Sequence, residues 1–196
     1  HCGTLYTGGE ERNPGPLLNV LAGLAKQGII GAPEENSPQC IGLQIILRAT
    51  SHDDIINAMI RKRGLGRIVT TAPPLPYPQT LQEMFQADGL LLFQGESFNH
   101  LIPAKLFEYL RANRPVFALT GAQGDSARIL HQAGLRTIVP LEEESSIRVE
   151  FLDFLEQLRA GSAPLPDKTV VTGYSRRIQA RRLADLFDSL NTEQSM

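Results

Sequence analysis

The sequence predicts an α/β fold: a Rossmann-like, doubly wound parallel sheet of about six strands, with helices on both faces. Short strand-like runs alternate with helix-like segments along the 196 residues, as expected of successive βαβ units. Several of these runs are apolar throughout, which is typical of strands that helices cover on both faces. The hydrophobic share of 42% gives such a domain enough residues for one core.

Three strands are predicted in the first half of the chain, at 2–6, 43–47 and 68–71. Apolar residues recur between them at the spacing of one helical face. These residues are Leu17, Leu18, Leu21, Leu24 and Ala25 after the first strand, and Ile55, Ile56, Met59 and Ile60 after the second. Pro73 and Pro74 follow the third strand and end it, because proline has no backbone N–H for a sheet.

The second half of the chain predicts strands at 89–93, 116–119 and 137–139. Pro103 suits the first turn of a helix, where its missing N–H costs nothing. Further helices are predicted after Gly124 and along the apolar stripe that begins at Ile147.

We expect residues 1–172 to form the Rossmann-like domain, 173–190 to form a C-terminal helix, and 191–196 to be a disordered tail. Apolar residues at helical spacing predict a buried face for that helix. They are Leu183, Leu186, Phe187 and Leu190. The chain opens at His1 inside a strand-like run, so we expect it to be part of a longer protein.

The composition argues against several classes of protein. A formal net charge of −2 gives no basic footprint for nucleic acid. No stretch reaches the roughly 18 consecutive apolar residues of a transmembrane helix. Cys2 and Cys40 have neither metal-ligand spacing nor the density of a disulfide scaffold, so we expect a cytoplasmic protein without a metal. The arginine pairs at 176–177 and 181–182 suggest a solvated helix face, with peripheral membrane association as the alternative.

Ligands of open parallel sheets bind outside the carboxyl ends of the strands. That rule selects the loops at 3–12, 71–77, 94–103 and 120–125. The first loop has three glycines and Arg12 ahead of a helix, so its backbone could approach a pyrophosphate that Arg12 grips. Taken alone, the loop is more typical of an ordinary βα turn with a solvated arginine.

The helix predicted after Pro103 is more specific. Lys105 and Glu108 are three residues apart and therefore share one helical face. A lysine at a helix N-terminus opposes the helix dipole unless an anion is bound there. The carboxylate of Glu108 could accept hydrogen bonds from the hydroxyls of a ribose. The competing interpretation is a surface Lys–Glu pair of little energetic weight.

The residues IPAKLFEYL at 102–110, followed by RPV at 114–116, resemble the K-x-x-E-Y…P-[IV] signature of GT-B glycosyltransferases of the "group 1" superfamily. The run ADGLLL at 87–92 resembles the strand that precedes this signature in the family. GTLY at 3–6 resembles the first strand and glycine turn of the family's C-terminal domain. These similarities occur in the family's order and span most of the chain.

The resemblance implies a nucleotide-sugar-binding half of a glycosyltransferase, whose acceptor binds to a separate N-terminal domain. It assigns the ribose to Glu108 and the pyrophosphate to the turn at Gly3 and Thr4 with Arg12 and Lys105, near the helix start at Pro103. The base would lie against the loop that contains Pro73. The donor, a nucleoside-diphosphate sugar, is then a substrate, and no cofactor or metal is implied.

Two positions depart from the family's pattern. Many members have a second glutamate where this chain has His100, and an arginine where it has Thr4. His100 becomes a candidate for contact with the donor sugar or for proton transfer. Two other functions stay open: a nucleotide-sugar 2-epimerase, which shares the fold, and a binding domain without turnover.

Overall fold

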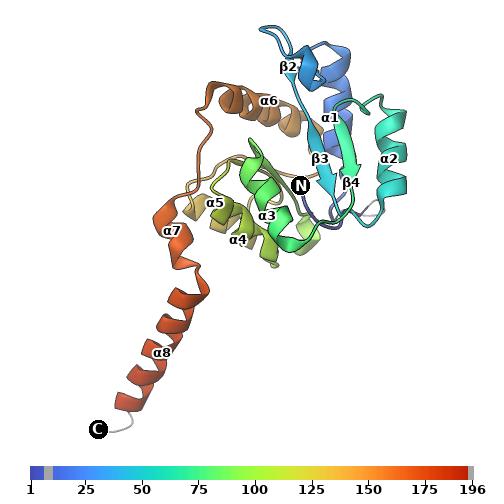
Figure 1. Ribbon diagram of the computed structural model, residues 1–196. Helices are drawn as coiled ribbons and strands as arrows, with labels where there is room; N and C mark the ends of the chain where they lie inside the picture. The colour runs from blue at the N-terminus through green and yellow to red at the C-terminus, as the bar shows by residue number, and fades with distance from the viewer. Residues whose placement is uncertain (7–10, 194–196) are drawn as a thin grey trace.

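The computed structural model describes residues 1–6 and 11–193, with side chains described through residue 190. It is an α/β fold in which every paired strand is parallel to its neighbour, so the predicted fold class is confirmed. In Figure 1 the helices lie around the central strands, and one helix extends away from the rest of the molecule.

The central strands form two parallel groups. In one, β3 (Ile45–Arg48) pairs with β4 (Val69–Ala72). In the other, β6 (Val116–Leu119) lies between β5 (Leu90–Phe93) and β7 (Ile138–Val139). A small separate pair, β1 (Ile30–Gly31) and β2 (Ile41–Gly42), was not predicted from the sequence.

The amino-terminal segment joins the two groups. The amide of Gly3 donates to the carbonyl of Arg48 at 2.8 Å, and Cys2 forms a parallel bridge to the same strand. On the other side, the His1 ring contacts the carbonyl of Leu91 in β5, with Nδ1 and the oxygen 3.0 Å apart. The strands therefore follow the order of a doubly wound fold, with the first strand in the centre.

Helices follow the strands as the apolar spacing predicted, apart from a short helix at 168–173 that was not predicted. They are α1 (Gly15–Lys26), α2 (Asp53–Lys62), α3 (Tyr77–Gln86), α4 (Ala104–Ala112), α5 (Asp125–Gln132), α6 (Glu144–Ala160), α7 (Lys168–Gly173) and α8 (Arg176–Glu193). Short 3-10 turns, η1 (Pro33–Glu35) and η2 (Glu96–Phe98), interrupt two of the loops. Pro103 is the N-cap of α4 rather than its first helical residue.

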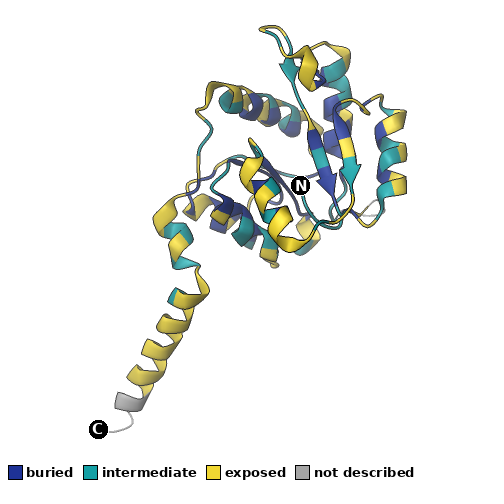
Figure 2. Ribbon diagram, in the orientation of Figure 1, coloured by how far each residue is buried: buried dark blue, intermediate teal, exposed yellow. Residues whose placement is uncertain are grey.

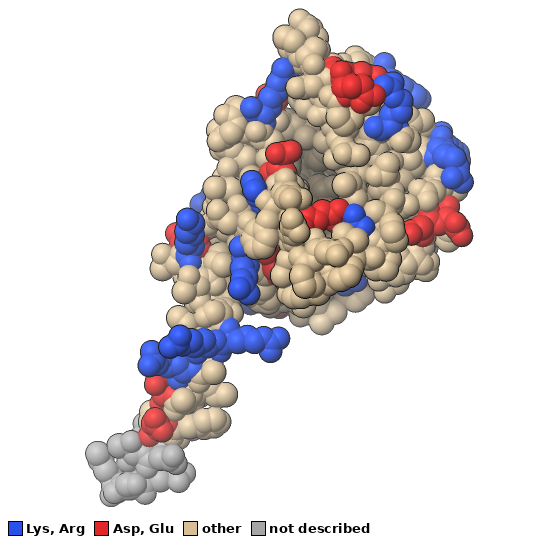
Figure 3. Space-filling model, in the orientation of Figure 1, with Lys and Arg blue, Asp and Glu red and all other residues tan. Residues whose placement is uncertain are grey.

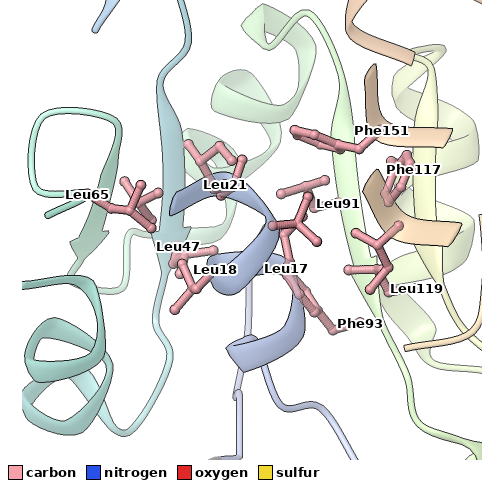
Figure 4. Packing of buried hydrophobic residues seen from close by; sticks show 14 of the residues in the cluster. Leu17, Leu18, Leu21, Leu47, Leu65, Leu91, Phe93, Phe117, Leu119 and Phe151 are labelled. Atoms are coloured by element: carbon pink, nitrogen blue, oxygen red, sulfur yellow. The ribbon is translucent and has the colours of Figure 1, made fainter. Parts of the chain in front are cut away.

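Strand β5 is apolar at every position, and its place in the core explains why. Leu91 and Phe93 belong to the core cluster that α1, α2 and α6 cover, while Leu90 and Leu92 belong to the cluster under α4 and α5. Successive side chains of a strand point to opposite faces, so both faces of β5 are buried. Figure 4 shows Leu17, Leu91 and Phe93 together in the first cluster, and Figure 2 shows buried residues along the central strands.

The C-terminal helix differs from the prediction. Instead of a buried face, α8 has Leu183, Leu186, Phe187 and Leu190 each at least half exposed. Figure 2 shows the described part of α8 almost wholly exposed, projecting from the rest of the molecule. Its regular spacing shows only that the helix is amphipathic. The predicted tail begins inside this helix, which continues to Glu193, and residues 194–196 lie outside the described part. No described helix is long and apolar enough to cross a membrane.

Candidate functional site

Gly3 and Lys105 lie in contact at the carboxyl ends of the central strands, where the amino-terminal segment ends. Gly3 has a φ of +114°, a conformation that favours glycine. A Cβ at Gly3 would collide with the Lys105 Nζ, so the end of that flexible side chain would have to move to admit one. The positive φ of Gly3 is a separate reason why glycine suits this position.

Arg12 approaches the same position from the first loop. Its guanidinium carbon lies 5.4 Å from the ring centre of Phe98 and 5.9 Å from that of Tyr6. Both distances suit a cation over an aromatic face, which orients the side chain. The amide of Gly95 donates to the Glu11 carbonyl at 2.6 Å and fixes this end of the loop to η2. The glycines of the loop, at 8 and 9, lie outside the described residues.

Lys105 and Arg12 form a pair of like charges. Burial, and after it the nearby charge of Arg12, together lower the pKa of the Lys105 amine to about 8. Within residues 1–6 and 11–190, no acidic side chain makes a salt bridge with either cation. An anion bound between them would relieve both the repulsion and the cost of burying the charge.

Glu108 lies one turn further along α4 and is half-buried. Its carboxylate faces the phenol of Tyr77, the first residue of α3, and hydrogen bonding between them raises the pKa of Tyr77. Tyr77 is 60% exposed, so the pair is open to solvent from the side of α3. The structure therefore gives Glu108 a neighbour that the sequence did not predict.

A buried arginine fixes the backbone of the loop that contains Pro73. Arg48 forms an ion pair with Glu83 of α3 and donates to the Pro73 carbonyl from Nη1 at 2.6 Å. The charged hydrogen bonds of this pair lower the pKa of Glu83. Pro73 itself is exposed, so its ring is available to a ligand while its backbone is fixed.

A buried network around Gln94 orders the loop between β5 and α4. The Gln94 amide donates to the carbonyls of Phe98 at 2.6 Å and Leu101 at 2.5 Å. Ser126 of α5 donates to the Gln94 side-chain oxygen at 2.6 Å. Sequence reasoning missed both residues. A polar residue directly after the apolar strand at 89–93 was the available signal.

The remaining predicted residues are less closely tied to the site. His100 is exposed, and its side chain forms no hydrogen bond with the described residues. The Thr4 hydroxyl lies 3.2 Å from that of Ser51, directed toward the turn before α2. Within the described residues, no three His, Cys, Asp or Glu side chains gather in a way that could hold a metal ion.

A cavity of about 630 Å³ lies elsewhere, at the amino ends of β3 and β5. None of the predicted site residues from Gly3 to Glu108 lines it, although His1 and Cys2 do. Figure 3 shows a hollow near the centre of one face, in the area where Figure 1 marks the amino terminus. The residues predicted to bind a ligand and this cavity therefore lie at opposite ends of the central strands.

No protein-family model matches the chain, and no curated protein matches it. Among solved structures it is similar to a mutant of TarM from S. aureus, a GT-B glycosyltransferase, in complex with fondaparinux, α-GlcNAc-glycerol and UDP. The chain has a glycosyltransferase-like fold. The TM-score is 0.54 over 83% of this chain, which spans 29% of the length of that protein. At 14% sequence identity, the similarity concerns the fold alone.

Proposed function

We propose that this chain binds a nucleoside-diphosphate sugar and forms the donor-binding part of a GT-B glycosyltransferase. The observation that carries the proposal is the pair of cations at Gly3. Lys105 is desolvated, Arg12 repels it, and the described residues offer neither one a salt bridge. A diphosphate supplies the negative charge that this arrangement lacks.

The diphosphate would lie against Gly3, at the amino end of α4. The helix dipole and the unpaired N–H groups of the first turn add to the attraction of Lys105. During transfer, the bond between the anomeric carbon and the diphosphate oxygen breaks, and negative charge grows on the leaving diphosphate. Lys105 and Arg12 would stabilise that charge, which is the main electrostatic contribution expected here.

Glu108 follows at the distance of one helical turn, on the side toward Tyr77. Its carboxylate would accept hydrogen bonds from the ribose hydroxyls, with the base extending toward the loop at 71–77. The acceptor and any catalytic base would come from a domain outside this chain. The solved complex of the TarM mutant contains UDP, which makes UDP the first nucleotide to test.

Calorimetry with UDP on the Lys105→Met variant tests the proposal. Removing a charged partner of a phosphate should cost roughly 1.5–3 kcal/mol of binding free energy, about 10- to 150-fold in affinity. Lys62→Met is the matched control, because Lys62 is exposed at the end of α2, away from the loop of Gly3. Equal affinities for the wild-type chain and Lys105→Met would contradict the proposed phosphate site.

A further inference from the structure

Two aromatic rings contact the guanidinium of Arg12, and they come from different segments of the chain. Tyr6 belongs to the amino-terminal segment, and Phe98 is the last residue of η2, in the loop between β5 and α4. The guanidinium carbon lies 5.9 Å from the centre of the Tyr6 ring and 5.4 Å from that of the Phe98 ring. Each distance is within the range of a cation–π contact.

Hydrogen bonds fix the backbone that carries each ring. The Tyr6 amide donates to the Arg12 carbonyl at 3.3 Å, which keeps these two residues adjacent across the first loop. The Phe98 carbonyl accepts from the side-chain amide of Gln94 at 2.6 Å, and Gln94 is buried. The position of the Arg12 side chain therefore depends on two ordered segments, and not only on the loop to which it belongs.

The contacts with the rings do not use the hydrogen-bond donors of Arg12. Arginine presents five N–H groups in one plane, and pairs of them match the oxygens of a phosphate. Within residues 1–6 and 11–190, the Arg12 side chain makes neither a salt bridge nor a hydrogen bond. Its N–H groups therefore have no acceptor in this part of the protein.

Arg48 is fixed in the opposite way. Its guanidinium forms an ion pair with Glu83 and donates to the Pro73 carbonyl at 2.6 Å, so the protein itself neutralises the charge and occupies the donors. Arg12 keeps both its charge and its N–H groups for another partner. Because its charge also reaches Lys105, an anion that contacts both cations fits this arrangement.

We propose that Tyr6 and Phe98 are positioning residues of the phosphate site: their rings hold the Arg12 guanidinium in place and leave its N–H groups free to bind the diphosphate. This inference rests on the proposed function and adds two residues to it. An arginine that is held before the ligand arrives loses less conformational freedom on binding than a freely moving one. The rings therefore strengthen binding without contacting the ligand.

A double-mutant cycle with UDP, followed by calorimetry, measures the coupling between the rings and Arg12. Phe98→Leu and Tyr6→Leu each remove a ring and keep an apolar side chain. We expect each to weaken UDP binding about two- to fivefold, and both together roughly 5- to 30-fold, as for exposed cation–π contacts. In the Arg12→Met background the paired substitution should change the affinity less than about twofold, because the cation is absent.

Three variants control for effects on the fold. Phe85→Leu is the matched control, because Phe85 is exposed near the end of α3, and it should bind UDP as the wild-type chain does. Phe98→Tyr keeps the ring and should recover most of the affinity that Phe98→Leu loses. Tyr6→Leu alone carries the test if the Phe98 variant unfolds, since Tyr6 is already 38% exposed. Ring variants that bind UDP as well as Phe85→Leu does would overturn the proposal.

The same measurements separate this inference from the proposed function. Equal losses from the ring substitutions with and without Arg12 would mean that the rings act on the loops and not on the cation, which overturns the inference. If Lys105→Met weakens UDP binding and Arg12→Met does not, the phosphate site stands and the role of Tyr6 and Phe98 is wrong. If neither substitution weakens binding, both proposals are wrong.

Discussion

The two ends of the central strands differ in chemistry although the same elements form both. At the carboxyl end, Lys105 and Glu108 of α4 lie near Arg12 of the first loop, and Gln94 fixes the loop that precedes α4. At the amino end, phenylalanine and leucine side chains of α6 line a cavity together with polar residues such as Glu83, Asp88 and Arg159. Two cations that make no salt bridge with the described residues lie at the carboxyl end, whereas the cavity lies at the amino end. The proposed ligand site rests on those charges and not on cavity volume.

The largest effect is expected from Gln94→Leu, which tests whether buried polar contacts hold the carboxyl end together. The substitution leaves the carbonyls of Phe98 and Leu101 and the hydroxyl of Ser126 without their amide partner. We expect a loss of about 2–4 kcal/mol in the free energy of unfolding. Urea denaturation measures this, with Gln82→Leu on the exposed side of α3 as control. A loss no larger than that of the control would mean that the network does not order the loop.

A smaller effect is expected from Glu108→Ala, which asks whether the carboxyl end recognises ribose as well as phosphate. Losing hydrogen bonds to a charged acceptor should cost about 1.5–3 kcal/mol of UDP affinity. The free energy of unfolding should change little, because the carboxylate is half-buried and faces an exposed tyrosine. Glu150→Ala, on the exposed side of α6, serves as the control. A variant that unfolds, or one that binds UDP with wild-type affinity, would make Glu108 structural.

The smallest effect concerns pH. Without a ligand, the Lys105 amine has a pKa of about 8, below its ordinary 10.5. A bound diphosphate favours the charged form, so binding takes up a proton above pH 8 and UDP affinity falls as the pH rises from 8 to 10. The slope should stay under about tenfold per pH unit. Lys105→Met should lose this slope. For the free protein the sign is opposite: the unfolded chain keeps the proton up to 10.5, so stability rises from pH 8 to 10.5.

Much of the fold could be predicted because its signals are local. The apolar run at 89–93 and the proline at 103 each reflect a demand of the immediate backbone: the run forms β5 from Leu90 to Phe93, and Pro103 begins α4 within one residue of the predicted position, as its N-cap. The contact of Gly3 with Lys105 depended instead on a resemblance between distant segments. Periodicity alone gave no reason to bring residues 3 and 105 together.

The wrong or missed predictions concern features that depend on contacts between distant segments, which local sequence patterns do not reveal. The spacing of Leu183, Leu186, Phe187 and Leu190 identifies an amphipathic helix, but amphipathicity does not specify what covers the apolar face, and here that face is exposed. Gln94 was missed because a polar residue at a strand end is ordinary in sequence. Its importance appears only when the carbonyls of Phe98 and Leu101 curve back toward it.

The contact between Gly3 and Lys105 also constrains how this protein can change over evolution. The ammonium group occupies the space that a Cβ at position 3 would need. A homologue with a larger residue at position 3 would need another backbone conformation there, and the end of the Lys105 side chain would have to move as well. We therefore expect glycine to be kept at position 3 wherever lysine is kept at position 105, although the two positions are 102 apart in the chain.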